Sequence, residues 1–162
     1  MTTNIQLARQ VARHVQLKSI ALRNAHLDSF LPVGEPVSEP ISVTQQHRCG
    51  CEELSLEDRR EIHVSIDFRC QASRNGGEKG EDGEQALLKL EATFVLVYTL
   101  PSDAKYESRC LQYFAELNGA YNAWPYWREF VQTATGRVGL SGVLLPVYRP
   151  ISKEVAKEAE AK

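Results

Sequence analysis

The sequence lacks any long hydrophobic run. Its longest apolar stretches, at residues 94–98 and 143–147, are far shorter than the roughly 20 residues that a membrane-spanning helix needs. Residues 1–15 include Arg9, Arg13 and several polar side chains, where a secretory signal peptide would need an unbroken apolar core. We therefore expect a cytoplasmic protein that does not insert into membranes.

An excess of positive charge is also absent. The 162 residues include 19 Lys and Arg against 21 Asp and Glu, which gives a formal net charge of −2. Proteins that bind nucleic acid by counterion release need a basic face, so we expect no nucleic-acid partner. A chain of this length forms one domain around a single core. We place that domain at residues 1–150.

The four cysteines show none of the even spacing of a secreted disulfide framework, so we expect reduced thiols. His47, Cys49 and Cys51 lie together in the motif H-R-C-G-C, and imidazole and thiolate groups can bind zinc. A structural zinc site also needs a fourth ligand, usually from a second C-x-x-C or H-x-x-x-H pair, and the sequence has neither. We prefer an ordinary strand or loop here and predict no metal and no cofactor.

Catalytic motifs are missing as well. The four histidines fall on expected strands or at an element boundary, in contexts that do not indicate a nucleophile–base pair. The glycine-rich stretch at residues 136–142 follows an expected helix instead of preceding one, so no helix N-terminus is directed at a phosphate group. We therefore predict that the protein is not an enzyme.

Apolar and polar residues alternate in four segments, as they do in strands. These segments are residues 15–28, 41–46, 61–72 and 85–99. In the first of them, Ile20 and Leu22 fall on the otherwise polar side, which suggests a contact with another chain. The charged, glycine-rich residues 74–84 predict a mobile hairpin loop between the last two strands.

Helical spacing of apolar residues appears in three segments. They are residues 4–14, 103–119 and 125–136. Ser102 or Asp103 can cap the second helix, Pro125 fits the first turn of the third, and Gly136 can end it. Residues 151–162 alternate in charge sign and form either a marginal helix or a frayed tail. The order of elements predicts an α+β fold with two C-terminal helices on one face of a sheet.

Aromatic residues concentrate between residues 113 and 130. They are Tyr113, Phe114, Tyr121, Trp124, Tyr126, Trp127 and Phe130. For any single one, packing in the core is the better interpretation, most simply for Tyr126. Tyr and Trp also favour interfaces and grooves because their polar atoms need partners. The whole set therefore suggests that some of these side chains face a partner.

Three motifs in this region resemble the signature of SecB-type export chaperones. They are W-P-Y-W-R-E-F-V at residues 124–131, T-G-R-V-G at residues 135–139 and L-L-P-V-Y at residues 144–148. Residues 15–28 also look like the first strand of that family, and residues 61–99 fit its third and fourth strands. The resemblance covers most of residues 15–148.

The resemblance implies a four-stranded antiparallel sheet with two helices, assembled as a homotetramer, a dimer of dimers. The implied contacts use the outer sheet faces and the first long helix, with Ile20, Leu22 and Tyr113 as candidates. It also implies an ATP-independent holdase that binds unfolded or precursor polypeptides in apolar grooves, which suits contacts that are not directional. The candidate polypeptide-binding residues are Trp124, Trp127, Phe130, Val43 and Leu54.

The chain departs from export chaperones in two respects. Relatives that deliver cargo to the SecA motor have an acidic outer sheet face, and here Asp28 keeps an acid while Asn24 stands where an Asp is expected. Residues 151–162 also lack the usual acidic end. SecB-like relatives include chaperones dedicated to the antitoxin of a toxin–antitoxin pair. The resemblance thus leaves two partners open: SecA, with Asp28 as the docking residue, or an antitoxin.

Overall fold

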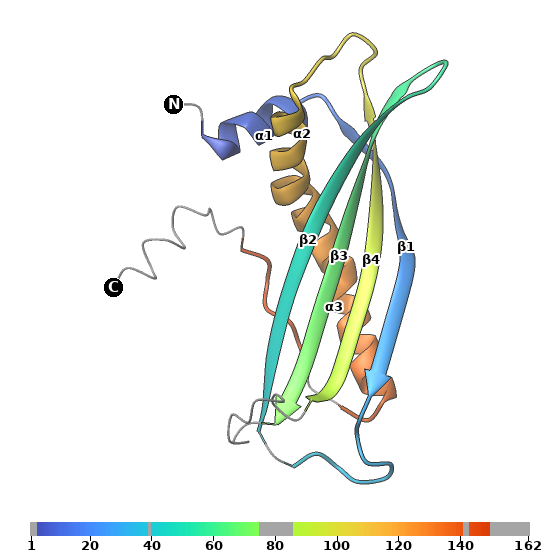
Figure 1. Cartoon of the computed structure of the whole chain (residues 1–162), viewed down its shortest axis with the longest axis vertical. Coiled ribbons are helices and arrows are strands. Elements are labelled where there is room, and N and C mark those ends of the chain that lie inside the picture. Colours follow the sequence, from blue (N-terminus) through green and yellow to red (C-terminus); the bar gives the residue numbers. More distant parts are fainter. Residues whose placement is uncertain (1–2, 39, 75–85, 141–142, 150–162) are drawn as a thin grey trace.

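A computed structural model describes residues 3–38, 40–74, 86–140 and 143–149 of the chain. Four long antiparallel strands form one sheet in the order β1-β4-β3-β2, so β1 and β2 are its two edges (Figure 1). The strands are β1 (Gln16–Ser29), β2 (Ile41–Ser55), β3 (Arg60–Arg74) and β4 (Ala86–Leu100). The α+β class and the four-stranded antiparallel sheet predicted from the sequence are confirmed.

All helices lie on one face of this sheet (Figure 1). They are α1 (Asn4–Ala12), α2 (Ser108–Phe114), the π-helical segment η1 (Ala115–Gly119) and α3 (Ala120–Arg137). The first helix is short and begins with a capping box, in which the Thr3 side chain accepts from the Gln6 amide. The longest helix, α3, packs over the central strands β3 and β4.

The two expected C-terminal helices are joined without a break, because α2, η1 and α3 follow one another directly. Pro125 lies inside α3 instead of at its start. Residues just before the proline, Ala120, Ala123 and Trp124, are buried against the sheet, and this packing holds them in the helix. The helix also continues past Gly136. It ends at a Schellman motif, where Gly139 has a φ of 82° and the Leu140 amide donates to the Thr135 carbonyl at 2.9 Å.

The core is formed by the inward sides of β3 and β4, as their alternation predicts. Six residues of each strand point at the helices and are at most 5% exposed. They are Ile62, Val64, Ile66, Phe68, Cys70 and Ala72 on β3, and Leu88, Leu90, Ala92, Phe94, Leu96 and Tyr98 on β4.

Strand β1 differs from the prediction because it contains two β-bulges. The pairing with β4 shifts register between Leu17 and Ser19 and again between Leu22 and Asn24. Each bulge adds one residue, which reverses the side on which the following residues point. Ile20 lies opposite Leu96 and Leu22 opposite Phe94, so both share the helix-facing side. The expectation that they lie on the outer, polar side is therefore wrong.

Strand β2 extends nine residues beyond the predicted end at residue 46, to Ser55. Residues 47–55 lack a clean apolar alternation because β2 is an edge strand with little of either side buried in the core. The predicted hairpin loop at residues 74–84 lies outside the described residues except for Arg74. The charged tail at residues 151–162 lies entirely outside them. The proposed domain boundary at residue 150 stays a prediction.

Candidate functional site

An open groove of about 940 Å³ lies between β2, the helices and the last described segment of the chain. This segment, residues 143–149, is named the strap, and it runs along the free edge of β2 (Figure 1). Four parts of the chain line the groove: α1, β2, the continuous helix from α2 to α3, and the strap. The lining residues are Asn4, Ile5, Gln45, His47, Arg48, Cys49, Gln112, Tyr113, Glu116, Leu117, Trp124, Pro146, Val147, Tyr148 and Arg149.

Strand β2 forms the first wall. Alternate side chains of a strand point to the same side, so Gln45, His47 and Cys49 face the groove together. Because β2 is an edge strand, no strand lies beside it on the side away from β3. The backbone N–H and C=O groups along that edge are therefore not paired within the sheet. The wall thus offers both side chains and main-chain hydrogen-bonding groups.

The second wall is the turn of helix around η1. Tyr113, Glu116 and Leu117 follow at helical spacing and line the groove on one side of the helix. Helix and sheet come very close here, since a Cβ added to Gly119 would lie 2.7 Å from Val64 Cγ1. Glycine at this position therefore permits the close contact between η1 and β3.

The strap forms the third wall and is anchored by buried apolar side chains. Val143 and Leu145 are only 5% and 2% exposed, whereas Leu144 and Val147 are 58% and 60% exposed. The Trp124 indole Nε1 donates a hydrogen bond to the Pro146 carbonyl at 2.9 Å. The Tyr148 ring packs against Trp124 at a centroid distance of 5.3 Å and against His47 at 5.8 Å. These contacts give the groove an aromatic end.

Burial disfavours the charged forms of the imidazole and thiol groups on the groove side of β2. Burial lowers the pKa of His47, an effect that the Glu116 carboxylate partly opposes. Burial, together with Glu116 and Asp67, raises the pKa of the Cys49 thiol to about 12. Burial alone raises the pKa of Cys51 to about 11. Protonated thiols are poor nucleophiles and poor metal ligands.

The H-R-C-G-C motif does not form a metal site in the described part of the chain. His47, Cys49 and Cys51 are successive inward residues of β2 and are therefore spread along the strand. No group of three or more His, Cys, Asp or Glu side chains within residues 3–38, 40–74, 86–140 and 143–149 could hold a metal ion.

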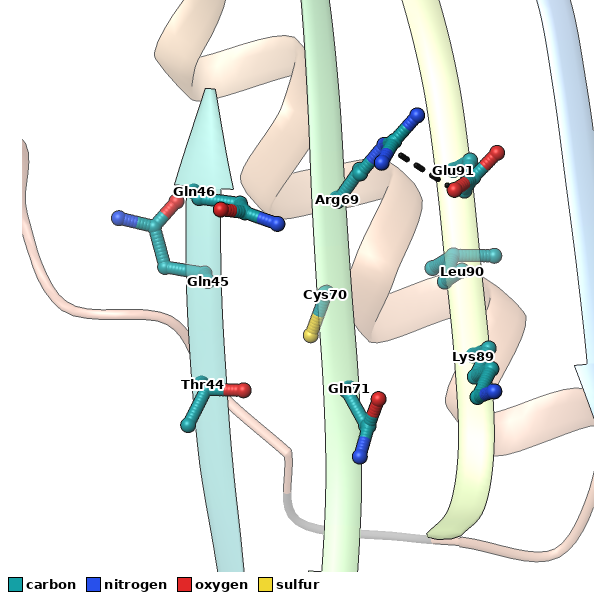
Figure 2. Close-up of a pocket in the computed structure, with 9 residues that line it drawn as sticks. All are labelled: Thr44, Gln45, Gln46, Arg69, Cys70, Gln71, Lys89, Leu90 and Glu91. Carbon is teal, nitrogen blue, oxygen red and sulfur yellow. Dashed lines mark ion pairs between the residues drawn. The ribbon is translucent and has the colours of Figure 1, made fainter. Parts of the chain in front are cut away.

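The outer face of the sheet carries charged residues that pair with one another. Gln46, Arg69 and Glu91 form one row across β2, β3 and β4, and Arg69 bonds Glu91 at 3.1 Å (Figure 2). In the next row, Arg48 pairs with Asp67 at 3.5 Å. The acids of this face are thus largely neutralised by neighbouring bases, and the face is not an acidic surface.

No protein-family profile matches the sequence, and no curated protein matches it. Among solved structures, the chain is similar to the Mycobacterium tuberculosis Rv1957 SecB-like chaperone, in complex with a ChAD peptide from the Rv1956 HigA1 antitoxin. The similarity has a TM-score of 0.74 at 16% sequence identity and covers 90% of this chain and 99% of that chain. The fold is SecB-like.

The SecB-like fold brings only some of the predicted binding residues to the groove. Trp124 lines it, although the side chain is 4% exposed and its indole N–H is already bonded to Pro146. Trp127 is 0% exposed and stacks on Phe68 at 5.1 Å, so its position is in the core. A substitution there reports on folding and not on binding. Phe130 is half-buried and stacks on Trp127 at 6.1 Å.

The two candidates on β2 lie on opposite sides of the sheet. Val43 is 39% exposed and shares the groove side of the strand, just before the lining residue Gln45. Leu54 is paired with Glu61 and lies on the outer face, away from the groove. Tyr126, expected in the core, is 51% exposed on α3, because the buried stripe of that helix runs through Trp124, Trp127 and Val131 instead.

The candidate assembly residues do not form one surface within this chain. Ile20 and Leu22 lie on β1, whereas Tyr113 lines the groove beside β2, at the opposite edge of the sheet. Asp28 sits on the outer face opposite Lys89, and its Oδ2 lies 3.0 Å from His26 Nε2. The acid predicted for docking therefore has two basic neighbours.

Several groove residues were missed by reasoning from the sequence. They are His47 as an aromatic contact, Leu117, Val147 and Tyr148. Tyr148 belongs to the L-L-P-V-Y motif, which is the sequence signal that points to it. In the part of the chain that the structure describes, no helix is both long and apolar enough to cross a bilayer.

Proposed function

We propose that this protein is an ATP-independent chaperone that holds unfolded or precursor polypeptide segments in the groove beside β2. The observation that supports this most is the open groove of about 940 Å³ at a free strand edge, where aromatic and apolar side chains line the groove together with polar ones. The same fold carries a bound peptide in the M. tuberculosis relative. The groove is a polypeptide site in this proposal.

The chemistry of the groove fits a polypeptide of varied sequence. Apolar contact is not directional, so Leu117, Val147 and Tyr148 can accept many side chains. An extended client can also add main-chain hydrogen bonds to the free edge of β2, as in strand addition. The protonated Cys49 thiol and neutral His47 leave the lining of the groove without an activated nucleophile. A holdase role without catalysis follows from this combination.

The paired charges of the outer face favour a dedicated client over export through SecA. Docking by charge complementarity needs an excess of one sign, and here Asp28, Asp67 and Glu91 each have a basic neighbour. We therefore propose the antitoxin of a toxin–antitoxin pair, or another single aggregation-prone partner, as the better-supported client. A reducing cytoplasm would suit the four free cysteines.

We further propose that β1 carries the contact between copies of the chain. Leu17 and Leu22 are 43% and 47% exposed on the helix-facing side of this edge strand, where α3 does not cover them. Apolar rows beside unpaired backbone are typical of strand edges that pair with another chain. A dimer through β1, and a homotetramer built from two such dimers, would cover this row.

Suppression of client aggregation tests the proposed function. The full chain should suppress aggregation of a chemically denatured enzyme upon dilution, without ATP. Val147→Asp places a charge in the groove and should abolish suppression, whereas Leu144→Asp makes the same type of change at a strap residue outside the lining. Equal activity of both variants would contradict the site, and failure of the unmodified protein with every client tried would contradict the function.

A further inference from the structure

The strap runs beside β2 without joining the sheet. Among the described residues, no backbone hydrogen bond connects residues 143–149 to β2, and the strap is not assigned as a strand. Pro146 has no N–H to donate, which disfavours strand pairing at its centre. The strap must therefore be held by side-chain contacts. Its position sets the position of the third wall of the groove.

Its two halves are held in different ways. The first half is anchored by Val143 and Leu145, which are buried in the core. The second half, residues 146–149, is largely exposed, and it supplies all four strap residues of the groove lining. The one hydrogen bond recorded for this half within the described chain is that of Trp124 Nε1 to the Pro146 carbonyl, at 2.9 Å.

This hydrogen bond sits at the junction between the two halves. Trp124 comes from α3, so the bond ties the strap to the rigid helix and not to the edge strand. One side of the same indole also packs against Tyr148, with ring centroids 5.3 Å apart. The Trp124 side chain thus contacts the strap twice: it bonds the main chain at Pro146, and it packs against the Tyr148 ring that lines the groove.

We propose that Trp124 is a positioning residue, whose indole N–H holds the second half of the strap in place as the third wall of the groove. The inference rests on the proposed function for its effect on clients. With the bond intact, Val147 and Tyr148 are preorganised to contact a client. Without it, binding must first order the strap, and this entropic cost weakens affinity.

Trp127 provides a closely matched control. It is a second tryptophan on the same helix, also buried, but its indole N–H has no hydrogen-bond partner among the described residues. Trp124→Phe and Trp127→Phe therefore remove the same atoms from buried sites, and only the first removes a hydrogen bond. Any loss of packing alone should appear in both variants.

The first measurement is the 15N relaxation order parameters of the backbone amides of residues 147–149, in the full chain without any client. Trp124→Phe should lower these order parameters clearly more than Trp127→Phe does. The second measurement is the affinity for reduced, carboxymethylated α-lactalbumin, a permanently unfolded chain. Trp124→Phe should weaken binding about three- to tenfold, the range expected for one lost hydrogen bond, while Trp127→Phe leaves it nearly unchanged.

A stricter variant avoids any change in ring size. In a Trp127→Phe background, Trp124 is the remaining tryptophan of the chain, so biosynthetic incorporation can replace it with benzothienylalanine, which keeps the ring shape and lacks the N–H. This protein should reproduce the lowered order parameters of residues 147–149. Unchanged order parameters, or tighter client binding when the strap is released, would overturn the positioning role. If the unmodified protein binds no client, the proposed function fails while the relaxation measurement still decides the role of Trp124.

Discussion

The two edge strands of the sheet have nearly equal length but very different surroundings. Beside β2, the helices, the strap and the strand enclose a groove. Beside β1, Leu17 and Leu22 remain exposed on the helix-facing side. Unpaired strand edges attract other chains, and a native protein usually covers or blunts them. The difference indicates two kinds of partner: an extended client at β2 and a second copy of the chain at β1.

The largest expected effect is on assembly. Leu22→Lys places a charge in the exposed apolar row of β1, and a two-fold interface would contain the change twice. We expect association to weaken by about a hundredfold or more, giving monomers in native mass spectrometry. Ala21→Lys is the control, because Ala21 lies on the outer face of the same strand, opposite Val95. If Ala21→Lys dissociates the assembly and Leu22→Lys does not, the outer face is the interface.

At the other edge, the expected effect is on client binding alone. Tyr148→Ala removes the ring that packs on His47 and Trp124 at the end of the groove. We expect affinity for an unfolded client to fall about tenfold by calorimetry, as for an aromatic anchor, with the oligomeric state unchanged. Tyr126→Ala, an exposed tyrosine on α3 outside the lining, should leave affinity unchanged. Similar losses in both variants would argue against the groove.

A third prediction concerns how β1 is attached to the sheet. Glu61 on β3 bonds Arg59 at 2.8 Å, His63 at 2.9 Å and Lys18, at the first bulge of β1, at 3.0 Å. The hydrogen bonds from Arg59, His63 and Lys18 lower the Glu61 pKa from 4.5 to about 2. Because the pKa is lower in the folded state, these contacts stabilise the fold above pH 4.5 and are lost as the pH falls toward 2.

Melting temperatures between pH 7 and pH 2 test this prediction. The unmodified protein should lose stability over the acidic range, and Glu61→Gln should start lower at pH 7 and show a flatter dependence. Glu91→Gln is the control, because that carboxylate is half exposed and pairs with Arg69 alone among the described residues. Parallel pH curves for Glu61→Gln and the unmodified protein would contradict the assigned role of Glu61.

The smallest effects are expected at two apolar residues of β2 on opposite sides of the sheet. Val43→Ala trims the groove side just outside the lining and should weaken client binding about twofold. Leu54→Ala acts on the outer face and should not change binding. Titration of one fluorescent unfolded client with each variant would show which substitution weakens client affinity more. A larger loss for Leu54→Ala would move the site to the outer face.

Much of the fold was predictable because it follows local patterns. Alternation along β3 and β4 gave the inward residues from Ile62 to Ala72 and from Leu88 to Tyr98. The bulges of β1 were not predictable in the same way, since an added residue reverses the side without changing composition. The helix start predicted at Pro125 was wrong as well. Burial of the residues before Pro125 outweighs the local preference of proline for a helix start.

The groove was harder to predict than the fold. Its aromatic character was expected, but the tryptophans predicted at the surface are buried, and the half-buried ring of Tyr148 lines the groove. Helical spacing shows which residues share a side of α3, but not that the strap returns to cover Trp124. Contacts between segments far apart in the sequence, such as Tyr148 and His47, need the tertiary structure.

Photo-cross-linking tests the central claim most directly. Benzoylphenylalanine placed at Tyr113 reports from the groove, and the same residue at Gln71 reports from the outer face of the sheet. Upon irradiation with an unfolded client, we predict cross-links from position 113, lost when Val147→Asp is added, and none above background from position 71. Cross-links from position 71 but not from position 113 would contradict the account.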